Sequence, residues 1–185
     1  HRFVYQEGLN IDILPFNPQQ TCSAGGLYVT TLDCIPHYLS YGEFLCEVDI
    51  PPDARCYIED KKLKADRIWI RAFTPVHEFP GWNDPTFCQQ AVKQNGLALQ
   101  FVKEQTLETC GRAVRQNGLA LQYVKEQTDK LCEWAIKQNK HALQYVNDQS
   151  LQMCEWAVKQ DGLSLRYVKE QSPQICEWAV KQNGY

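Results

Sequence analysis

The sequence has no apolar run that approaches the ~20 residues of a membrane-spanning helix. Residues 1–5 lack the apolar core of a signal peptide. An initiator methionine is also missing, so we expect a fragment or a processed form. These absences exclude the membrane from the expected partners.

Patterns that support catalysis or metal binding are scarce as well. The histidines have no metal-ligand spacing to any cysteine, and no Cys-x-x-Cys pair occurs. There is neither a Gly-rich phosphate loop nor a Gly-x-Ser-x-Gly elbow. Four carboxylates crowd one region, where a solvated turn is the simpler interpretation and a metal or acid–base site the alternative. They are Asp53, Glu59, Asp60 and Asp66. We predict no catalytic residues, no metal and no cofactor.

Positive charge is not concentrated enough for a nucleic-acid-binding domain. Residues 1–85 hold 7 Lys or Arg against 12 Asp or Glu, a net of −5, and residues 86–185 hold 12 against 10, a net of +2. A domain that binds nucleic acid usually presents a strongly basic face. Nucleic acid is therefore not an expected partner.

A period of 22 residues dominates the second half of the chain. Cysteine recurs at that spacing, and a fixed period of this size indicates a repeat array. Equivalent residues of stacked helices lie roughly 8–10 Å apart, whereas a disulfide needs Cα atoms within about 7 Å. We therefore predict buried thiols in a reducing, intracellular environment. The recurring cysteines are Cys88, Cys110, Cys132, Cys154 and Cys176.

Each repeat predicts two short helices. The first begins after a cap such as Asp84 or Ser172, and the second spans 119–127 in the second repeat, after which Thr128 caps the next unit. Asn183 and the following glycine predict a left-handed helix end. The chain stops within a fifth repeat, and an exposed apolar end predicts self-association or a covering protein partner.

The first part predicts a small, mainly antiparallel α+β domain. Strands are expected at 3–5, 11–14, 27–30, 44–50, 55–58 and 66–71, turns at 22–26, 51–54 and 59–64, and a helix at 32–41 after Thr31. The whole chain then divides into an α+β domain at 1–73, a linker at 74–84, and an α-solenoid of two-helix repeats at 85–185, with four full repeats and a partial fifth.

One column of the repeats suggests a binding surface. It holds Gln90 in the first repeat, Arg in the second and Trp in the others. A position that accepts Gln and Arg is not fully buried, and Trp and Arg are favoured at interface hot spots. The alternative is that each indole packs over its neighbouring repeat. The candidate partner-binding residues are Arg112, Trp134, Trp156 and Trp178.

Three further columns are polar. Two glutamine columns either form a ligand-binding ladder or satisfy backbone groups at helix ends, and we favour the second interpretation. A basic column complements the helix dipole, with acidic residues nearby balancing it, or else binds phosphate. The glutamines are Gln94, Gln116, Gln138, Gln160 and Gln182, then Gln105, Gln127, Gln149 and Gln171. The basic residues are Lys93, Arg115, Lys137, Lys159 and Lys181, and the acidic ones Glu104, Glu126, Asp148 and Glu170.

Several segments resemble proteins of mimivirus-type giant viruses of amoebae. Residues 5–10, 25–31, 35–42 and 64–68 resemble the N-terminal domain of many repeat proteins of these viruses, and the repeated phrase Ala-Val-Lys-Gln-Asn-Gly-Leu-Ala-Leu-Gln resembles their short helical repeats. The resemblance implies a non-enzymatic viral protein that acts as a protein-interaction or structural module, in the virion or the virus factory.

A second resemblance implies an enzyme. Residues 26–29 and 45–48 resemble the middle strands of the ADP-ribosyltransferase fold, which flank a nicotinamide site. Asp66 then occupies the place of the family's glutamate, Thr30 or Thr31 that of its serine, and His1 that of its histidine. The alternative function is an active or degenerate ADP-ribosyltransferase-like domain, although a fold likeness without its site residues is weak support.

Overall fold

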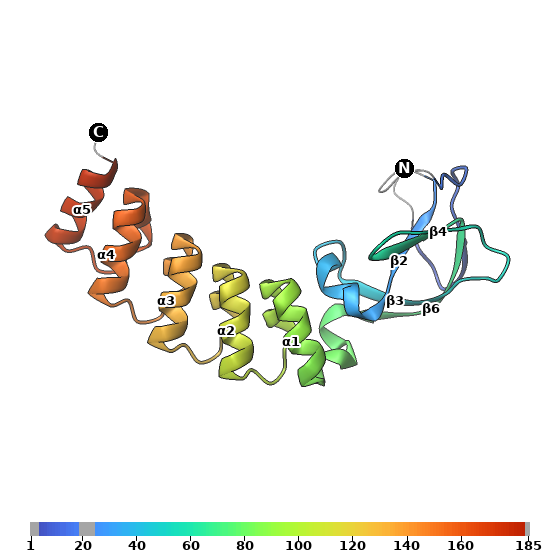
Figure 1. Ribbon diagram of the computed structural model, residues 1–185, viewed down its shortest axis with the longest axis horizontal. Helices are drawn as coiled ribbons and strands as arrows, with labels where there is room; N and C mark the ends of the chain where they lie inside the picture. The colour runs from blue at the N-terminus through green and yellow to red at the C-terminus, as the bar shows by residue number, and fades with distance from the viewer. Residues whose placement is uncertain (1–3, 19–24, 184–185) are drawn as a thin grey trace. The chain divides into compact units, whose positions relative to one another are not determined.

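The computed structural model describes residues 4–18 and 25–183 (Figure 1). The chain forms two compact units, His1–Pro80 and Gly81–Tyr185. Antiparallel sheets in the first unit precede helices in the second, as the predicted α+β class requires. His1, Phe3, the segment 19–24 with Cys22, and Gly184 lie outside the described residues.

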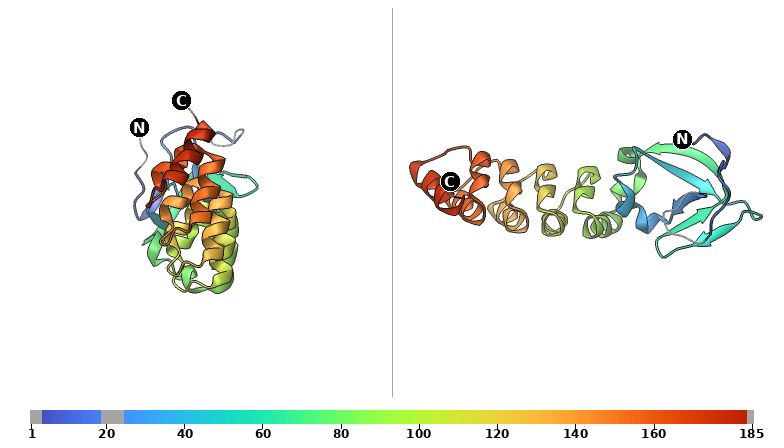
Figure 2. Two further views of the ribbon diagram at one scale, coloured as in Figure 1. Left: turned by 90° about the vertical axis from the view of Figure 1, so that its left-hand side faces the viewer. Right: turned by 90° about the horizontal axis from the view of Figure 1, so that it is seen from above.

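The first unit contains two three-stranded antiparallel sheets (Figure 2). One has the strand order β1-β6-β3 and the other the order β2-β5-β4. Their bounds are β1 Gly8–Ile11, β2 Leu27–Thr30, β3 Phe44–Asp49, β4 Cys56–Ile58, β5 Lys62–Ala65 and β6 Arg67–Pro75. β2 and β3 are therefore edge strands of their sheets.

The core of this unit is built by residues that alternate along its strands. Ile68 and Ile70 of β6 are buried with Leu27 and Ala65, while Trp69 between them is half exposed. This is the period of two that a strand with one buried face requires. The expected strands at 27–30, 44–50, 55–58 and 66–71 are confirmed to within four residues at their ends. The turn at 51–54 is confirmed by the hydrogen bond that Ala54 N donates to Pro51 O, 2.9 Å long.

The turn predicted at 59–64 is limited to residues 59–61, where Asp60 and Lys61 are exposed, and the prediction is wrong for 62–64. β5 begins at Lys62 and pairs with both β2 and β4, so it is the central strand of its sheet. Lys64 is fully buried, and its Nζ donates a 2.8 Å hydrogen bond to Asn17 O. Its stem lies under Gly26, where an added Cβ would stand 2.6 Å from Lys64 Cγ. A buried ammonium needs such a partner.

Three other predicted elements differ in the structure. The helix at 32–41 is a shorter 3₁₀ helix, η1 (Leu32–Tyr38), and Thr31 makes no side-chain cap. Pro36 lies inside it and has no N–H for an α-helical bond to residue 32. Val4 and Tyr5 belong to no strand, and β1 ends at Ile11 instead of beginning there.

The second unit repeats an α-helix followed by a 3₁₀ helix. The α-helices are α1 Pro85–Gln94, α2 Leu107–Gln116, α3 Asp129–Gln138, α4 Leu151–Gln160 and α5 Pro173–Asn183. The 3₁₀ helices are η4 Gly96–Phe101, η5 Gly118–Tyr123, η6 Lys140–Tyr145 and η7 Gly162–Tyr167. Before α1, η2 (Val76–Glu78) and η3 (Pro80–Asn83) occupy most of the segment 74–84, in which Val76 and Trp82 are buried.

Side-chain caps begin the α-helices, as the sequence predicts. Asp84 accepts from Thr86 N at 2.8 Å, Thr128 from Leu131 N at 3.4 Å, and Ser172 from Ile175 N at 3.3 Å. Each cap satisfies one of the donors that a helix N-terminus leaves open.

The helix ends differ from the prediction. Asn95, Asn117, Asn139 and Asp161 have extended backbones, with φ from −144° to −158°, and not the left-handed conformation expected from the Asn-Gly pair. Each donates its backbone N–H to the α-helix and accepts at its side chain from the following 3₁₀ helix. One residue thus ends one helix and caps the next.

The second helix of each repeat is also shorter than expected. η5 ends at Tyr123 instead of Gln127, and Val124 is extended. The reason lies in the neighbouring repeat: Gln105 accepts from Lys125 N at 3.0 Å and donates to Tyr123 O at 2.8 Å. These backbone groups therefore need no helical partner.

The repeat core consists of small and branched apolar residues. Ala91, Ala113, Ala135 and Ala157 have no exposed surface. The cysteines among the described residues are free thiols. Burial raises the pKa of Cys132 to about 11, so this thiol is neutral and unreactive at pH 7. No helix in the described part of the chain combines the length and apolarity needed to cross a membrane.

Candidate functional site

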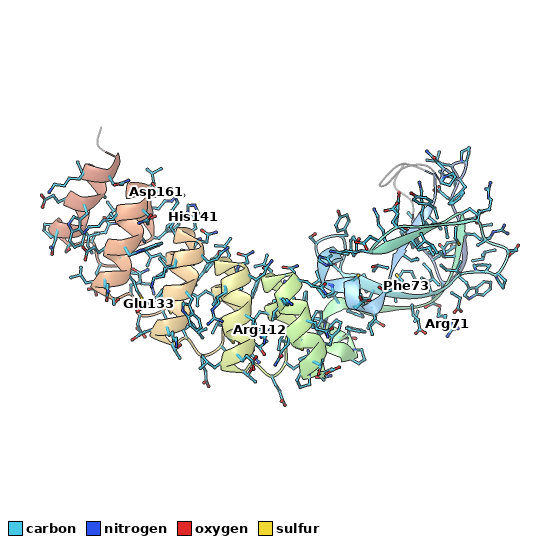
Figure 3. The ribbon with its side chains drawn as sticks, in the orientation of Figure 1. Arg71, Phe73, Arg112, Glu133, His141 and Asp161 are labelled. Atoms are coloured by element: carbon cyan, nitrogen blue, oxygen red, sulfur yellow. The ribbon has the colours of Figure 1, made fainter. Side chains whose placement is uncertain are left out.

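The aromatic column, defined as Gln90, Arg112, Trp134, Trp156 and Trp178, lies along one side of the α-helices. Gln90 and Arg112 are exposed, and the three indoles are partly buried. Arg112, labelled in Figure 3, forms a 2.8 Å ion pair with Glu108 one turn earlier. Exposure therefore decreases from the polar members of the column to the three indoles.

Two of the indoles pack against the preceding helix. The Arg115 guanidinium lies 3.7 Å from the ring centre of Trp134, and Lys159 Nζ lies 5.0 Å from that of Trp178. A Cβ on Gly111 would stand 3.1 Å from the Trp134 ring, so the helices meet closely there. Cation–π contacts of this kind stabilise by about 0.5–1 kcal/mol at exposed sites. Packing over the neighbouring repeat and partial exposure therefore coexist in one column.

The glutamines join neighbouring repeats through backbone groups, the interpretation that the sequence favours. Gln127 donates to Tyr145 O at 2.8 Å and accepts from Asn147 N at 3.0 Å. Gln116 accepts from Gly96 N at 2.6 Å and donates to Gln94 O at 3.2 Å. The side-chain amides of Gln116 and Gln127 thus already hydrogen-bond to the backbone, which leaves them little capacity to bind a ligand.

The basic column is neutralised differently from the prediction. Lys159 pairs with Glu155 at 2.5 Å and Lys181 with Glu177 at 2.6 Å, each one helical turn apart. Glu104 and its equivalents, expected as balancing charges, belong to none of the ion pairs of the described residues. Intrahelical pairs of this kind contribute little stability, about 0.3–0.5 kcal/mol.

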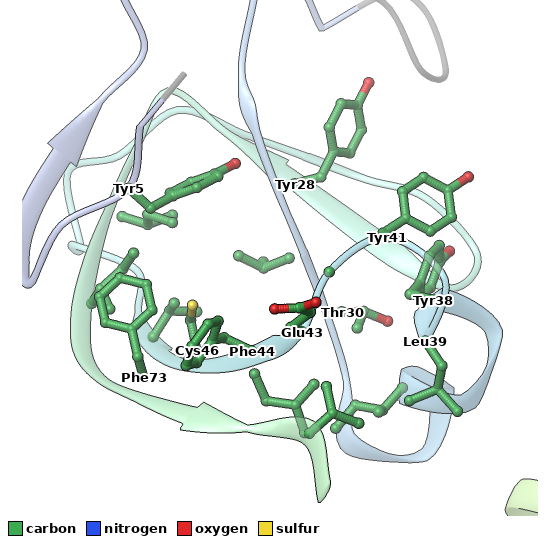
Figure 4. Close-up of a pocket in the computed structure, with 18 residues that line it drawn as sticks. Tyr5, Tyr28, Thr30, Tyr38, Leu39, Tyr41, Glu43, Phe44, Cys46 and Phe73 are labelled. Carbon is green, nitrogen blue, oxygen red and sulfur yellow. The ribbon is translucent and has the colours of Figure 1, made fainter. Parts of the chain in front are cut away.

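A separate hollow of about 820 Å³ lies in the first unit (Figure 4). It is lined by β2, η1 and β3, including the edge strands of both sheets. Tyr28, Tyr38 and Tyr41 lie to one side in this view, and Phe44 and Phe73 to the other. Its volume is that of a small-molecule pocket, and Phe44 is 56% exposed.

The hollow holds no activated nucleophile among its described residues. Burial raises the pKa of the Cys46 thiol, and burial with nearby Cys46 and Asp12 raises that of Tyr5. Both groups are therefore protonated at neutral pH, whereas a reactive cysteine needs a lowered pKa.

The candidate acid of an ADP-ribosyltransferase-like site does not line this hollow, and His1 lies outside the described residues. Tyr28 and Cys46, on the two strands that carry the resemblance, do line it together with Thr30. Asp66 is absent from the described lining, and its carboxylate is held by Arg55 at 2.9 Å and Arg67 at 3.4 Å. The structure therefore separates the candidate acid from the candidate pocket.

Three of the four residues of the acidic cluster form ion pairs, whereas Asp60 is exposed and belongs to none of those of the described residues. Asp53 pairs with Arg67 at 3.2 Å, and Glu59 with Lys62 at 3.3 Å. Within the described ranges, no group of His, Cys, Asp and Glu side chains is arranged to hold a metal ion.

Comparison with known proteins finds similarity to repeat proteins of a giant virus. The chain is 45% identical over 49 residues to "Putative ankyrin repeat protein R229" of Acanthamoeba polyphaga mimivirus, covering 26% of this chain and 16% of the relative. It is 42% identical over 55 residues to "Putative ankyrin repeat protein R868" of the same virus, covering 29% of this chain and 27% of the relative. The chain thus matches less than a third of the length of these relatives. No family model and no solved structure matches it.

Sequence reasoning found only part of the hollow. The resemblance at 26–29 and 45–48 marked two of its strands, but η1 and β6, which also line it, carry no such signal. The sequence also shows lysine at 140, where the sister repeats have glycine. Its consequence depends on the structure, in which Gly96 and Gly118 lie close to the following α-helix.

Proposed function

We propose that this chain is a non-enzymatic protein-interaction module of a giant-virus type. In this proposal residues 85–185 form an α-solenoid of 22-residue repeats, with a small α+β domain at 1–73 and a linker at 74–84. The partner is a protein, in the reducing host cytoplasm or the virion, and the module serves as a structural or virus-factory component. The similarity to the mimivirus ankyrin repeat proteins supports a viral repeat protein.

The observation that carries the proposal is the aromatic column. Three indoles recur at the same position of α3, α4 and α5, each partly exposed, with cations of the preceding helix over two of them. Trp and Arg dominate interface hot spots because they bury a large area at a small cost in conformational entropy. Repeat arrays supply extended surfaces of this kind without catalytic residues.

The test compares partner capture with stability in one set of variants. Affinity purification from the native source is carried out with the wild-type chain and with the triple variant Trp134→Ala, Trp156→Ala, Trp178→Ala. We expect capture of the specific partner to fall at least tenfold, a loss of about 1.4 kcal/mol or more, with a smaller fractional loss of the free energy of unfolding.

The matched control replaces three exposed glutamines of the 3₁₀ helices, Gln100, Gln122 and Gln144, with alanine. Each of them bonds only to the carbonyl three residues earlier. The control should capture the partner like the wild type. Retention of the partner by the tryptophan variant, with a large loss of stability, would assign the indoles to packing and reject the proposal.

A further inference from the structure

The junction between α3 and α4 differs from its neighbours at one residue. Gly96 and Gly118 begin η4 and η5, and an added Cβ would stand 2.4 and 2.3 Å from the carbonyl oxygens of Ala113 and Ala135 in the following α-helix. Real Cβ atoms do not approach closer than about 3.0 Å. Lys140 occupies this position at the start of η6. Its Cβ therefore keeps α4 farther away than α2 and α3 lie at the sister junctions.

The hydrogen bonds between repeats also differ at Lys140. Gly96 N and Gly118 N donate to the amide oxygens of Gln116 and Gln138 at 2.6 and 2.5 Å. In the part of the chain that the structure describes, no such bond joins Lys140 to Gln160, the equivalent glutamine. The backbone bond between repeats is thus missing at this junction.

An ion pair and a ring contact replace the missing bond. Lys140 Nζ lies 2.8 Å from Asp161 Oδ2, and the His141 ring packs edge-on against Tyr167 at 5.6 Å between ring centres. Figure 3 shows His141 and Asp161 at the same end of α3 and α4. At the other end, Gln127 before α3 still donates to Tyr145 O, in the segment before α4, at 2.8 Å. The repeats are therefore hydrogen-bonded where α3 and α4 begin and held apart by Lys140 as a wedge where these helices end.

The wedge opens a cavity of about 60 Å³ on the side of the aromatic column. We call it the α3–α4 socket; its lining is Glu133, Ile136, Lys137, Gln152, Met153 and Trp156. Trp156 also differs from its sister indoles: among the described residues no cation lies over its ring, whereas Arg115 covers Trp134 and Lys159 covers Trp178. This indole is therefore the one whose face the preceding helix leaves open to a partner.

We propose that the socket determines partner specificity by accepting one aliphatic side chain from a protein segment that carries an acidic residue within one helical turn. The proposal rests on the proposed protein-interaction function. Ile136, Met153 and Trp156 supply apolar walls, and the volume suits a small aliphatic group but not an aromatic ring.

The acidic residue is inferred from the charges of α3. Lys137 pairs with Glu133 at 3.8 Å, a longer contact than the 2.5 and 2.6 Å of the equivalent pairs in α4 and α5. Of the charged groups that the structure describes, only Glu133 and Lys137 line the socket, and their long contact leaves the Lys137 ammonium weakly neutralised. Complementary charge at an interface favours the matching partner, so a carboxylate of the partner fits here.

The open geometry is tested by exchanging the two residue types between junctions. In Lys140→Gly the amide of residue 140 should gain the bond to Gln160, and its hydrogen exchange should slow at least fivefold, since a hydrogen bond contributes about 1 kcal/mol. In Gly118→Lys the amide of residue 118 should exchange faster by a similar factor. Unchanged exchange of both amides would overturn the wedge.

The occupant is tested with a phage-displayed library of random peptides selected on the immobilised full chain. We expect enriched peptides to share an aliphatic residue and an acidic residue within one turn, and to bind Lys140→Gly at least tenfold more weakly. Replacing either peptide residue, by alanine or by the corresponding amide, should weaken binding. Equal binding to wild type and Lys140→Gly, or no enrichment, would overturn the socket.

The failures of the two proposals are distinguishable. If the triple tryptophan variant loses the native partner while Lys140→Gly captures it like the wild type, the socket is rejected and the interaction function stands. If the native partner binds regardless of the indoles, both proposals are rejected, because Trp156 is a wall of the socket.

Discussion

Asp66 contacts two arginines, Arg55 just before β4 and Arg67 at the start of β6. Its carboxylate accepts from Arg55 N at 3.0 Å, Arg55 Nε at 2.9 Å and Arg67 Nε at 3.4 Å, and its side chain is 12% exposed. Burial alone would raise the pKa of Asp66, but the Arg55 and Arg67 hydrogen bonds outweigh it and hold the pKa below its usual value.

A lowered pKa makes the stability of the first unit depend on pH in a defined direction. The stabilisation is complete above the ordinary aspartate pKa, near 3.9, and is lost as pH falls through the lower pKa of the folded state. Asp66→Asn should therefore speed hydrogen exchange in β4 and β5 roughly fivefold at pH 7. This difference from the wild type should disappear at the acid end of the range.

The matched control is Asp60→Asn, because Asp60 is exposed and belongs to none of the ion pairs of the described residues. The β4 and β5 amides of this variant should exchange like those of the wild type both at pH 7 and at the acid end of the range. Equal rates for Asp66→Asn and the wild type at neutral pH would show that the Asp66 bonds contribute no stability.

Single residues also show where sequence reasoning fails. The alternation of Ile68 and Ile70 is a direct consequence of burying one face of a strand, so β6 was predictable. Lys64 was not, because its burial depends on Asn17 O and on the space under Gly26, neither of which is local in sequence. Charge within a short segment indicates a solvated turn only when no distant partner is available.

At the scale of elements, each repeat is held to the next by a glutamine. Gln127 makes two bonds to the backbone between η6 and α4, and it also accepts from the Cys132 thiol at 3.6 Å. The existence of the α-helices and their caps followed from sequence. The 3₁₀ form of the second helices did not, because these contacts from the neighbouring repeat replace the helical bonds of residues 123–125 and their equivalents.

We therefore expect Gln127→Ala to be costly. It leaves Tyr145 O and Asn147 N without their partners, and we predict a loss of about 2 kcal/mol in the free energy of unfolding. The measurement is urea denaturation followed by far-ultraviolet circular dichroism. Gln122→Ala removes only a bond within η5, so it should cost less than about 0.5 kcal/mol. Similar midpoints for the two variants would contradict the role of Gln127.

The site was predictable to a smaller extent than the repeats. The partial exposure of the aromatic column could be predicted by comparing repeats, because a position that holds Gln90 in one repeat and Arg112 in another is not fully buried. The hollow could not be predicted in the same way, because β2 and β3 belong to different sheets, where they pair with β5 and β6 respectively.

At the scale of the molecule, α5 exposes an apolar position that other repeats bury. Val180 is 63% exposed, whereas the equivalent Val92, Val114 and Val158 are 0% exposed and Ile136 is 2% exposed. Apolar surface of this kind favours association, because contact with a second copy removes it from water.

Sedimentation velocity of the chain should show self-association that increases with concentration. Val180→Gln should shift the protein toward the monomer. Leu107→Gln is the control, because Leu107 is equally exposed, at 63%, but lies at the first turn of α2. A wild-type chain that stays monomeric at every concentration would reject association through this face.

The bonds between repeats also bear on how the protein ages chemically. An Asn-Gly sequence deamidates when the glycine nitrogen attacks the asparagine side-chain carbonyl and closes a five-membered ring. In Asn95-Gly96 and Asn117-Gly118 that nitrogen donates to a glutamine of the next repeat, and the asparagine oxygen caps a 3₁₀ helix. Both reacting groups are thus held out of the attack geometry, so the stacked repeats protect these two otherwise fragile sequences for as long as the array stays folded.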